Sequence, residues 1–265
     1  MLKIGFIGFG NMASAIAKGI LSSKELDVAI SAYDPFPTML DKFSDSITKS
    51  NSALQLVREN KYIFLCVKPQ MLENALEPIS NEFTSEHIVI SIVTGFTIES
   101  IKELTGNRCP VVRTMPNTPM LLGYGTTALA KPSDIKEEDY IIVKSIFECV
   151  GSAYEIPSDK FNEIIPVNGS SPAFTYLFAK TIAEQASKYG LDYSIALEMI
   201  SKTLIGSAMM LMESGKTPEE LIEMVSSKKG TTVAALETMH NGGFVESLKH
   251  GIKSCIERAY ELGKL

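Results

Sequence analysis

The sequence predicts an α/β fold in which a doubly wound parallel sheet is followed by an all-helical C-terminal part. Up to residue 156, short β-rich runs alternate with helical stretches, and no convincing strand follows Pro157. Such alternation is typical of βαβ units that carry helices on both faces of a sheet. A chain of 265 residues is long enough for two domains. We therefore expect one domain over residues 1–157 and a second over residues 158–265.

The first expected strand, Leu2–Ile7, runs directly into Gly8-Phe9-Gly10-Asn11-Met12-Ala13 and then into a helical stretch. This is the motif G-x-G-x-x-A between a strand and a helix, as in dinucleotide-binding domains of the Rossmann type. Gly8 permits the tight turn, and Gly10 lets the backbone approach a pyrophosphate without a Cβ in the way. Ala13 keeps helix and strand close together. We expect the pyrophosphate at the N-terminus of this helix.

The second expected strand, Val28–Tyr33, ends just before Asp34, which lies 21 residues beyond Ala13. The fold places at this position the acid that holds the adenosine ribose. A carboxylate accepts hydrogen bonds from free 2′- and 3′-hydroxyls and repels a 2′-phosphate. The nearest downstream cation, Lys42, is too far along the chain to compensate. We therefore expect NADH or NADPH as cofactor, with NADH preferred because of Asp34.

The remaining elements of the first domain follow the same alternation. Further strands are expected at Tyr62–Val67, His87–Ile92, Cys109–Thr114, Gly125–Ala130 and Ser152–Ile156. Helical patterns lie between most of them, as in Pro69–Ile79 and Ile98–Leu104.

The second domain is marked by helix start and stop signals. Starts are expected at Ser171-Pro172, Asp192, Thr217-Pro218, Thr231 or Thr232, and Phe244. Stops are expected at Gly190, before Gly215, at Asn241-Gly242-Gly243 and near Glu261. The run Met209–Met212 is too apolar for an exposed helix face, so it belongs either to the domain core or to a contact with another subunit.

Three loops carry residues suited to ligand binding. In Cys66–Gln70, Lys68 either touches the cofactor's ribose or phosphate or is solvated. In Arg113–Pro119, Asn117 either orients the nicotinamide or the substrate or satisfies a tight turn. The loop Ser226–Thr232 leads into a helix N-terminus, where hydroxyls and free N–H groups form either a carboxylate-binding site or a simple N-cap.

Composition excludes several other classes of protein. The net charge is −6 and no basic block is present, so we expect no nucleic-acid partner. No apolar run approaches the length of a membrane span and the chain starts with a strand, so we expect neither a membrane segment nor a signal peptide. Four widely spaced cysteines without a C-x-x-C pair predict reduced thiols in a cytoplasmic protein. The three histidines lack metal-ligand spacing, so no metal site is predicted.

Over its whole length, the chain resembles the pyrroline-5-carboxylate reductases, which catalyse the last step of proline synthesis. The resemblance rests on the glycine motif and on the motifs Val67–Gln70, Arg113–Pro119, Asn168–Ala173, Gly230–Thr232 and Asn241–Phe244. Two segments depart from the family pattern. The family usually has Ser-Pro-Gly-Gly where this chain has Ser227–Gly230, and Gly-Ser-Gly-Pro where it has Gly169–Pro172.

The resemblance implies site residues and an assembly. The implied cofactor-binding residues are Phe6, Ile7, Gly8, Phe9, Gly10, Asn11, Met12, Ala13, Asp34, Asn51, Cys66, Val67, Lys68, Pro69, Ile92, Val93 and Thr94. Thr232 is the implied catalytic residue, hydrogen-bonded to the ring nitrogen of a cyclic imino acid, and the substrate-binding residues are Thr231, Gly230, Asn117, Ser227 and Lys229. The family further implies a homodimer through the helical domain, active sites built from two subunits, and often a ring of dimers.

The predicted reaction is hydride transfer from NADH or NADPH to the C=N carbon of 1-pyrroline-5-carboxylate, giving proline. A cyclic imine nitrogen is protonated near neutral pH, so orientation and electrostatics can suffice without a histidine acid. Two alternatives remain open. One is a dehydrogenase of the hydroxy-acid type, for which Lys180 is the candidate acid. The other is a non-catalytic nucleotide-binding paralogue, which the altered Lys228-Lys229 loop would suit.

Overall fold

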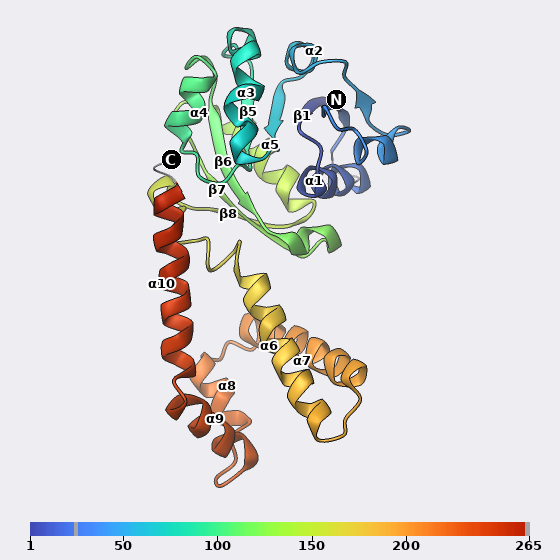
Figure 1. Ribbon diagram of the computed structural model, residues 1–265. Helices are drawn as coiled ribbons and strands as arrows, with labels where there is room; N and C mark the ends of the chain where they lie inside the picture. Colours follow the sequence, from blue (N-terminus) through green and yellow to red (C-terminus); the bar gives the residue numbers. More distant parts are fainter. Residues whose placement is uncertain (24–25, 263–265) are drawn as a thin grey trace. The chain divides into compact units, whose positions relative to one another are not determined.

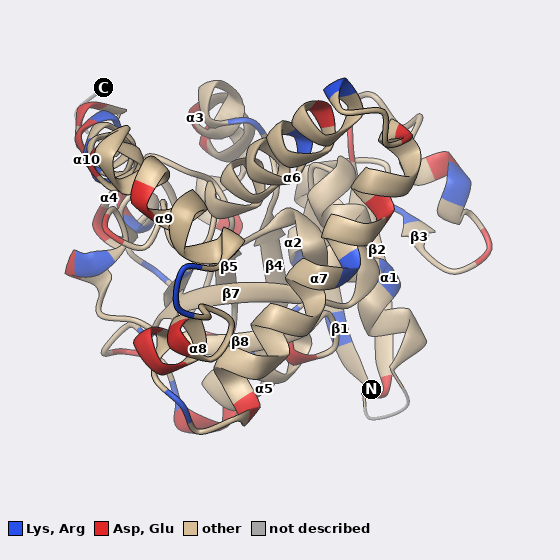
Figure 2. Cartoon of the chain, turned by 90° about the horizontal axis from the view of Figure 1, so that it is seen from below, with Lys and Arg blue, Asp and Glu red and all other residues tan. Residues whose placement is uncertain are grey.

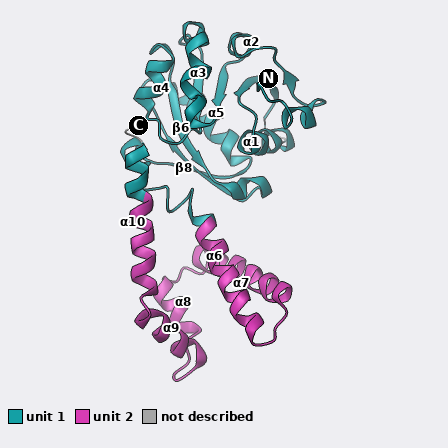
Figure 3. Ribbon diagram, in the orientation of Figure 1, with its two compact units in different colours: residues 1–172, 256–265 teal, residues 173–255 magenta. Residues whose placement is uncertain are grey.

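A computed structural model describes residues 1–23 and 26–262 of the chain (Figure 1). It divides into two compact units, shown in different colours in Figure 3: residues 1–172 with 256–265, and residues 173–255. The first unit extends beyond the expected boundary at residue 157. The reason is local packing, because Phe161 is fully buried in the core of the sheet domain and Glu163 accepts a hydrogen bond from the Tyr260 hydroxyl at 2.6 Å.

Unit 1 is built on an eight-stranded sheet with the order β3-β2-β1-β4-β5-β6-β7-β8. Its strands are β1 (Leu2–Ile7), β2 (Val28–Tyr33), β3 (Thr48–Lys49), β4 (Tyr62–Leu65), β5 (Ile88–Ser91), β6 (Val111–Pro116), β7 (Gly125–Ala130) and β8 (Gly151–Glu155). The predicted α/β fold class is confirmed. The two-residue strand β3 was not predicted, because so short a run carries no periodic signal.

One pairing departs from the predicted parallel sheet. Strands β6 and β7 are antiparallel, whereas β7 and β8 pair in parallel. The connection between β6 and β7 holds only the short 3₁₀ helix η4 (Thr118–Leu122). A parallel crossover needs a dozen or more residues, so this connection allows only an antiparallel return.

Helices cover both faces of the sheet. On one face lie α1 (Asn11–Ser22) and α5 (Glu137–Glu148), and on the other α2 (Ala53–Glu59), α3 (Leu72–Leu76) and α4 (Ile98–Leu104). Strand residues alternate between the two cores: Phe6 and Phe64 face α1, whereas Ile7 and Leu65 face α2. Burial of each such side chain contributes about 1.5–3 kcal/mol to the free energy of folding. Four short 3₁₀ helices complete the unit: η1 (Leu40–Phe43), η2 (Pro69–Met71), η3 (Glu77–Glu82) and η5 (Ser158–Lys160).

The helical part contains α6 (Ser171–Lys188), α7 (Tyr193–Glu213), α8 (Pro218–Met224), α9 (Thr231–Asn241) and α10 (Phe244–Leu262). The predicted caps at Asp192 and Thr217 are confirmed, the latter as a capping box with Glu220. Two predicted caps are wrong. Ser171 already lies inside α6, where its hydroxyl donates to the Val167 carbonyl at 2.8 Å. Gly230 precedes α9 as its N-cap, and no side chain caps that helix.

Helix α7 is apolar and poorly covered within unit 2. By length and composition alone it is the one described helix that could cross a membrane. Ala196 is its single buried residue, and Met209–Met212 stay partly exposed. The core alternative for this methionine run therefore does not hold within one subunit.

An ion pair between a buried carboxylate and a partly exposed lysine ties the start of α5 to the start of β4. The Asp139 carboxylate, with 7% side-chain exposure, lies 2.6 Å from Lys61 Nζ and accepts a hydrogen bond from the Tyr62 hydroxyl at 2.7 Å. Burial alone raises the pKa of Asp139, but the hydrogen bonds from Lys61 and Tyr62 outweigh it, so the pKa lies below its ordinary value. The charged carboxylate therefore stabilises the fold above its unfolded-state pKa, and this contribution is lost as the pH falls through the folded-state pKa.

We expect Asp139→Asn to lower the free energy of unfolding at neutral pH by about 1–3 kcal/mol, because the Lys61 ammonium loses its charged partner. Urea unfolding of both proteins measures this difference. The difference should shrink as the pH falls through the folded-state pKa, below which the native carboxyl is also protonated. An equal difference at neutral and acid pH would contradict the role of the charge.

Candidate active site

The glycine loop between β1 and α1 has the geometry of a phosphate-binding turn. Gly8 has a φ of +85°, and a Cβ on it would lie 2.9 Å from the backbone of Cys66 and Val67. A Cβ on Gly10 would meet nothing within 4 Å, so the space in front of this residue is open. No side chain caps the N-terminus of α1, and Ala13 is fully buried against the sheet. The residues present therefore fit a dinucleotide pyrophosphate.

Asp34 joins the end of β2 to this loop. Its Oδ2 accepts a hydrogen bond from the Phe9 backbone N–H at 2.6 Å, and its Oδ1 accepts one from Phe36 N–H at 2.8 Å. The Phe9 ring is 1% exposed and packs edge-on against Phe6 and Phe43. Phe6 and Phe9 are thus core side chains, and only their backbone atoms are available to a cofactor. Asp34 remains half-buried beside the glycine loop, where a ribose is expected.

A cavity of about 390 Å³ lies at the carboxyl ends of β1, β2 and β4. Strand β1 has β2 on one side and β4 on the other, so chain order reverses here and leaves a crevice for a ligand. The cavity is lined by Ile7, Gly8, Tyr33, Pro35, Ser52, Ala53, Leu54, Val67, Met71, Asn74, Ala75, Pro78 and Ile79. Its mostly apolar lining suits a flat heterocycle such as adenine.

The cavity gathers only part of the predicted cofactor set. Ile7, Gly8 and Val67 line it, whereas Asn51 lies next to the lining residue Ser52. The wall formed by Tyr33, Pro35 and the residues from η2, α3 and η3 was not predicted from the sequence. Pro35 could have been found, because it directly follows Asp34. The others come from separate elements, and no local pattern distinguishes them from ordinary packing residues.

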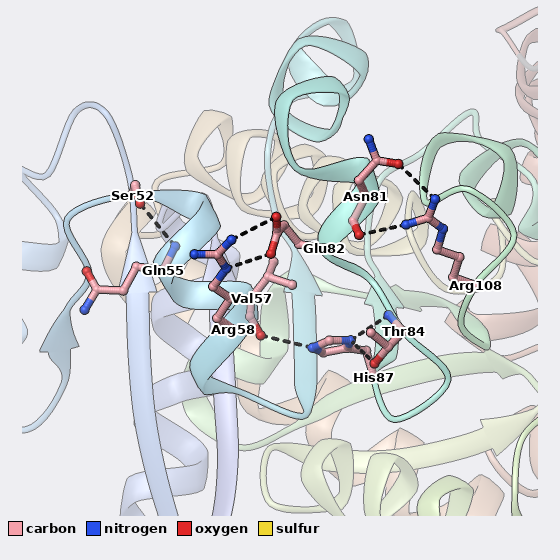
Figure 4. A network of polar contacts seen from close by, with 9 residues as sticks. All are labelled: Ser52, Gln55, Val57, Arg58, Asn81, Glu82, Thr84, His87 and Arg108. Carbon is pink, nitrogen blue, oxygen red and sulfur yellow. Dashed lines mark hydrogen bonds and ion pairs between the residues drawn. The ribbon is translucent and has the colours of Figure 1, made fainter.

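A polar network braces the wall of this cavity (Figure 4). Arg58 of α2 forms a two-pronged ion pair with Glu82 of η3, at 2.7 and 3.1 Å, which lowers the pKa of Glu82. His87 lies between the two elements, with Nδ1 accepting from Thr84 N–H and Nε2 near the Val57 carbonyl. These contacts hold the C-terminal ends of α2 and η3 together, and His87 has a structural role.

Two further predicted loops flank the glycine loop along the sheet edge. Cys66 follows β4, and burial raises the pKa of its thiol, so it is not a nucleophile. Lys68 is exposed just beyond it, and Ile92, Val93 and Thr94 follow β5 in the same way. Because the carboxyl ends of parallel strands meet at one edge, these segments extend the site from β1 towards β6.

Asn117, expected to orient nicotinamide or substrate, has a different task. It is 7% exposed, and both of its amide hydrogens and its Oδ1 bond to Thr126 and Asn168. Of the two alternatives for this residue, the geometry favours structural use of the side chain over direct ligand binding.

The predicted substrate loop lies in unit 2, between α8 and α9, where Lys228 and Lys229 make a basic segment (Figure 2). Gly230 N–H donates to the Ser227 carbonyl at 2.8 Å, which closes a tight turn. Lys229 has a φ of +61°, a left-handed conformation that favours glycine. Gly230, Thr231 and Thr232 then present the uncapped N-terminus of α9, with Thr231 exposed and Thr232 half-buried.

Lys180, the candidate acid of a hydroxy-acid dehydrogenase, is an exposed helix residue. Its ammonium lies 3.5 Å from Glu184, one turn further along α6. An exposed pair of this kind is typical of a solvated helix face and gives no sign of an active-site acid.

The glycine loop, the cavity at the switch point and the acid after β2 define a dinucleotide-binding protein of the Rossmann type. Comparison with known proteins agrees and is more specific. A family model for pyrroline-5-carboxylate reductase dimerisation matches residues 158–262, and one for coenzyme F420-dependent NADP oxidoreductases matches residues 3–95. The chain is 35% identical to pyrroline-5-carboxylate reductase 3 of Danio rerio, covering 99% of this chain and 92% of that protein. The chain belongs to the pyrroline-5-carboxylate reductase family.

Further relatives support the same assignment. Pyrroline-5-carboxylate reductase of Escherichia coli is 32% identical, over 99% of this chain and 98% of that protein. The crystal structure of the enzyme from Streptococcus pyogenes superposes with a TM-score of 0.89 at 27% identity, over 100% of this chain and 99% of that one. A Plasmodium falciparum pyrroline carboxylate reductase with NADP bound gives the same TM-score at 26% identity, covering 99% and 98%. The family expected from the motifs is confirmed.

The left-handed Lys229 generates a stability prediction. Lys229→Gly should raise the free energy of unfolding by up to about 1 kcal/mol, because the left-handed strain of about 1–2 kcal/mol exceeds the extra chain entropy of glycine. Chemical denaturation measures the change. Lys228→Gly is the matched control, since Lys228 has no positive φ; it should lower stability. A gain at both positions, or at neither, would refute the strain argument.

Proposed function

We propose that this chain reduces 1-pyrroline-5-carboxylate to L-proline with NADH or NADPH, the last step of proline synthesis. The observation that carries the proposal is that one chain has both a dinucleotide cradle in unit 1 and, in unit 2, a Gly230–Thr232 loop at an uncapped helix start. Relatives that span the full chain are named pyrroline-5-carboxylate reductase in a fish, in bacteria and in an archaeon, which supports it.

The geometry of unit 1 supports the following arrangement of the cofactor. The backbone of Gly8–Ala13 would hold the pyrophosphate, Asp34 the ribose hydroxyls, and the cavity beside Pro35 the adenine. The loops Cys66–Pro69 and Ile92–Thr94 would hold the nicotinamide half. When bound, the reduced cofactor supplies a hydride to the imine carbon.

The substrate would be held at the start of α9. This helix has no side-chain cap, so its first N–H groups and its positive dipole end are free to bind a carboxylate. Thr232 would accept the hydrogen bond of the protonated ring nitrogen, with Gly230, Thr231, Ser227 and Lys229 around the carboxylate. Because the imine arrives protonated, the chain needs to orient it and exclude water, and no histidine acid is required.

The assembly we propose is a homodimer through the helical part, extended to a ring of dimers, in the cytoplasm. The match to a dimerisation family over residues 158–262 supports the dimer. Helix α7 leaves Met199, Ile205 and Met212 at least 60% exposed, a cost that a second subunit would remove.

Turnover with the purified protein tests the function. It should oxidise reduced nicotinamide when pyrroline-5-carboxylate is supplied. Faster turnover of 2-keto or 2-hydroxy acids would favour the hydroxy-acid dehydrogenase instead. Cofactor binding without turnover of any of these substrates would favour the non-catalytic paralogue.

Light scattering at micromolar concentration should give a mass of at least a dimer. Dilution until the subunits separate should abolish activity, because the apolar face of α7 then meets water. A fully active monomer would contradict the proposed assembly.

We expect kcat/KM to favour NADH over NADPH by about 5- to 150-fold, since Asp34 and a 2′-phosphate repel each other. The Asp34→Asn variant should lower the ratio of kcat/KM with NADH to kcat/KM with NADPH. Its side-chain oxygen can still accept the hydrogen bond from the Phe9 N–H. The Asp34→Ser variant should also lower this ratio. It should in addition weaken binding of both cofactors, because the shorter serine side chain leaves the Phe9 N–H without an acceptor. Equal or better efficiency of the unaltered protein with NADPH would refute the preference.

Thr232→Ala should lower kcat by more than about tenfold, because the ring nitrogen loses its partner. Thr231→Ala is the matched control at the neighbouring, exposed hydroxyl, and it should change kcat far less. Melting temperatures of both variants separate catalysis from stability, since a hydroxyl that only supports the fold would change the melting temperature and leave kcat unaltered. A lowered melting point with unchanged kcat in Thr232→Ala would remove Thr232 from the site.

A further inference from the structure

Three side chains at the carboxyl end of β6 form a buried hydrogen-bonded group, which we call the Asn117 cluster: Asn117, Thr126 and Asn168. Asn117 and Asn168 are 7% and 5% exposed. Burying two amides is costly unless their polar atoms are hydrogen-bonded. The partners of these atoms therefore show which segments the cluster connects.

Asn117 is the centre of this cluster. Its Oδ1 accepts the Thr126 backbone N–H at 2.9 Å. Its Nδ2 donates to Thr126 Oγ1 at 3.0 Å and to the Asn168 carbonyl at 3.3 Å. An amide has two donor hydrogens, so Asn117 has no donor left for a ligand.

The chain of bonds continues to the backbone of β6. The Thr126 hydroxyl donates to Asn168 Oδ1, and Asn168 Nδ2 donates to the Met115 carbonyl at 2.5 Å. The cluster thus joins the end of β6, the start of β7 and the segment at residue 168. Gly169 continues that segment beside β6, since a Cβ on it would lie 3.7 Å from Met115 Sδ.

A second contact fixes the same segment further upstream. The Arg113 guanidinium of β6 lies 4.7 Å from the centre of the Phe161 ring, which is fully buried. A desolvated cation over an aromatic face is a favourable pair. Residues 161–170 have no regular helix or strand of their own, so their path depends on these contacts with β6.

We propose that Asn117 is a positioning residue. With Thr126 and Asn168 it fixes residues 168–170 at the carboxyl end of β6, and it affects turnover through that segment without touching the substrate. Ligands of open α/β sheets bind beyond this edge, so a shifted segment would misplace groups around the reacting atoms. The inference rests on the proposed function, because turnover is one of its two readouts.

The test compares Asn117→Ala, Asn168→Ala and the double variant with the unaltered protein. Each single variant should lower kcat by about tenfold or more. The dissociation constant of NADH should change by less than about twofold, because the cavity proposed for the adenine lies at β1, β2 and β4, with β5 between it and β6. The double variant should be no slower than the slower single variant, since one cluster can be broken only once. Thr126→Val should show the same loss of kcat as the two single variants. Thr126→Ser, which keeps the hydroxyl, should retain turnover.

Asn60→Ala is the matched control. Asn60 is 8% exposed and donates to Ser31 Oγ and the Leu56 carbonyl, both at 2.7 Å, in the same unit but away from β6. Its loss should lower the melting temperature about as much as Asn117→Ala. It should leave kcat unchanged, which separates lost stability from lost positioning.

Hydrogen exchange supplies a readout that does not need turnover. The Asn168 and Ser170 N–H groups donate to the Ile164 and Ile165 carbonyls. Both amides should exchange faster in Asn117→Ala and in Asn168→Ala, and not in Asn60→Ala. Should the unaltered protein fail to reduce the imine, the proposed function falls and this readout still decides the positioning role.

Three results would overturn the proposal. A raised KM for the imine in Asn117→Ala alone would mean direct contact with the substrate. If Asn117→Ala and Asn168→Ala have the same kcat as Asn60→Ala, the Asn117 cluster has a merely structural role. Unchanged exchange at residues 168 and 170 would mean that the cluster does not hold the segment.

Discussion

A Cβ at Gly8 would lie 2.9 Å from the backbone of Cys66 and Val67, and this close approach sets the geometry of the candidate site. The loops after β1 and β4 can meet only where one of them lacks a side chain and adopts a positive φ. Their meeting places the α1 N-terminus, the 390 Å³ cavity and the loop after β4 at one sheet edge. The network of Arg58, Glu82 and His87 then keeps the outer wall of that cavity in place.

Asp34 ties the end of β2 to the glycine loop. One carboxylate oxygen accepts the Phe9 N–H while the Phe9 ring is buried beside Phe6 and Phe43. The loop is therefore held from both sides, by the apolar core and by an acid at the ribose position. The carboxylate for which we propose a role in cofactor preference thus also keeps the glycine loop in shape.

The two units differ in how completely they bury their apolar residues. The sheet domain buries its strands on both faces, as alternation in β1 and β4 shows. The helical part exposes Ile205, Leu211 and Met212 on α7, although its caps at Asp192 and Thr217 are well formed. Local signals thus suffice to form each helix, while the burial of its apolar face needs a further surface, in keeping with membership of a family whose helical part dimerises.

The sequence by itself determined the succession of strands and helices along the chain, the glycine loop, the acid at Asp34 and most helix ends. These features depend on local periodicity, capping and turn chemistry. Only the tertiary structure decided the antiparallel β7, the cavity wall from Met71 to Ile79 and the use of Asn117. Asn117 and Asn168 are 51 residues apart, and no local pattern reveals that the Asn117 amide donates a hydrogen bond to the Asn168 backbone carbonyl. Such pairings arise from packing of distant segments, where burial forces polar groups to find partners.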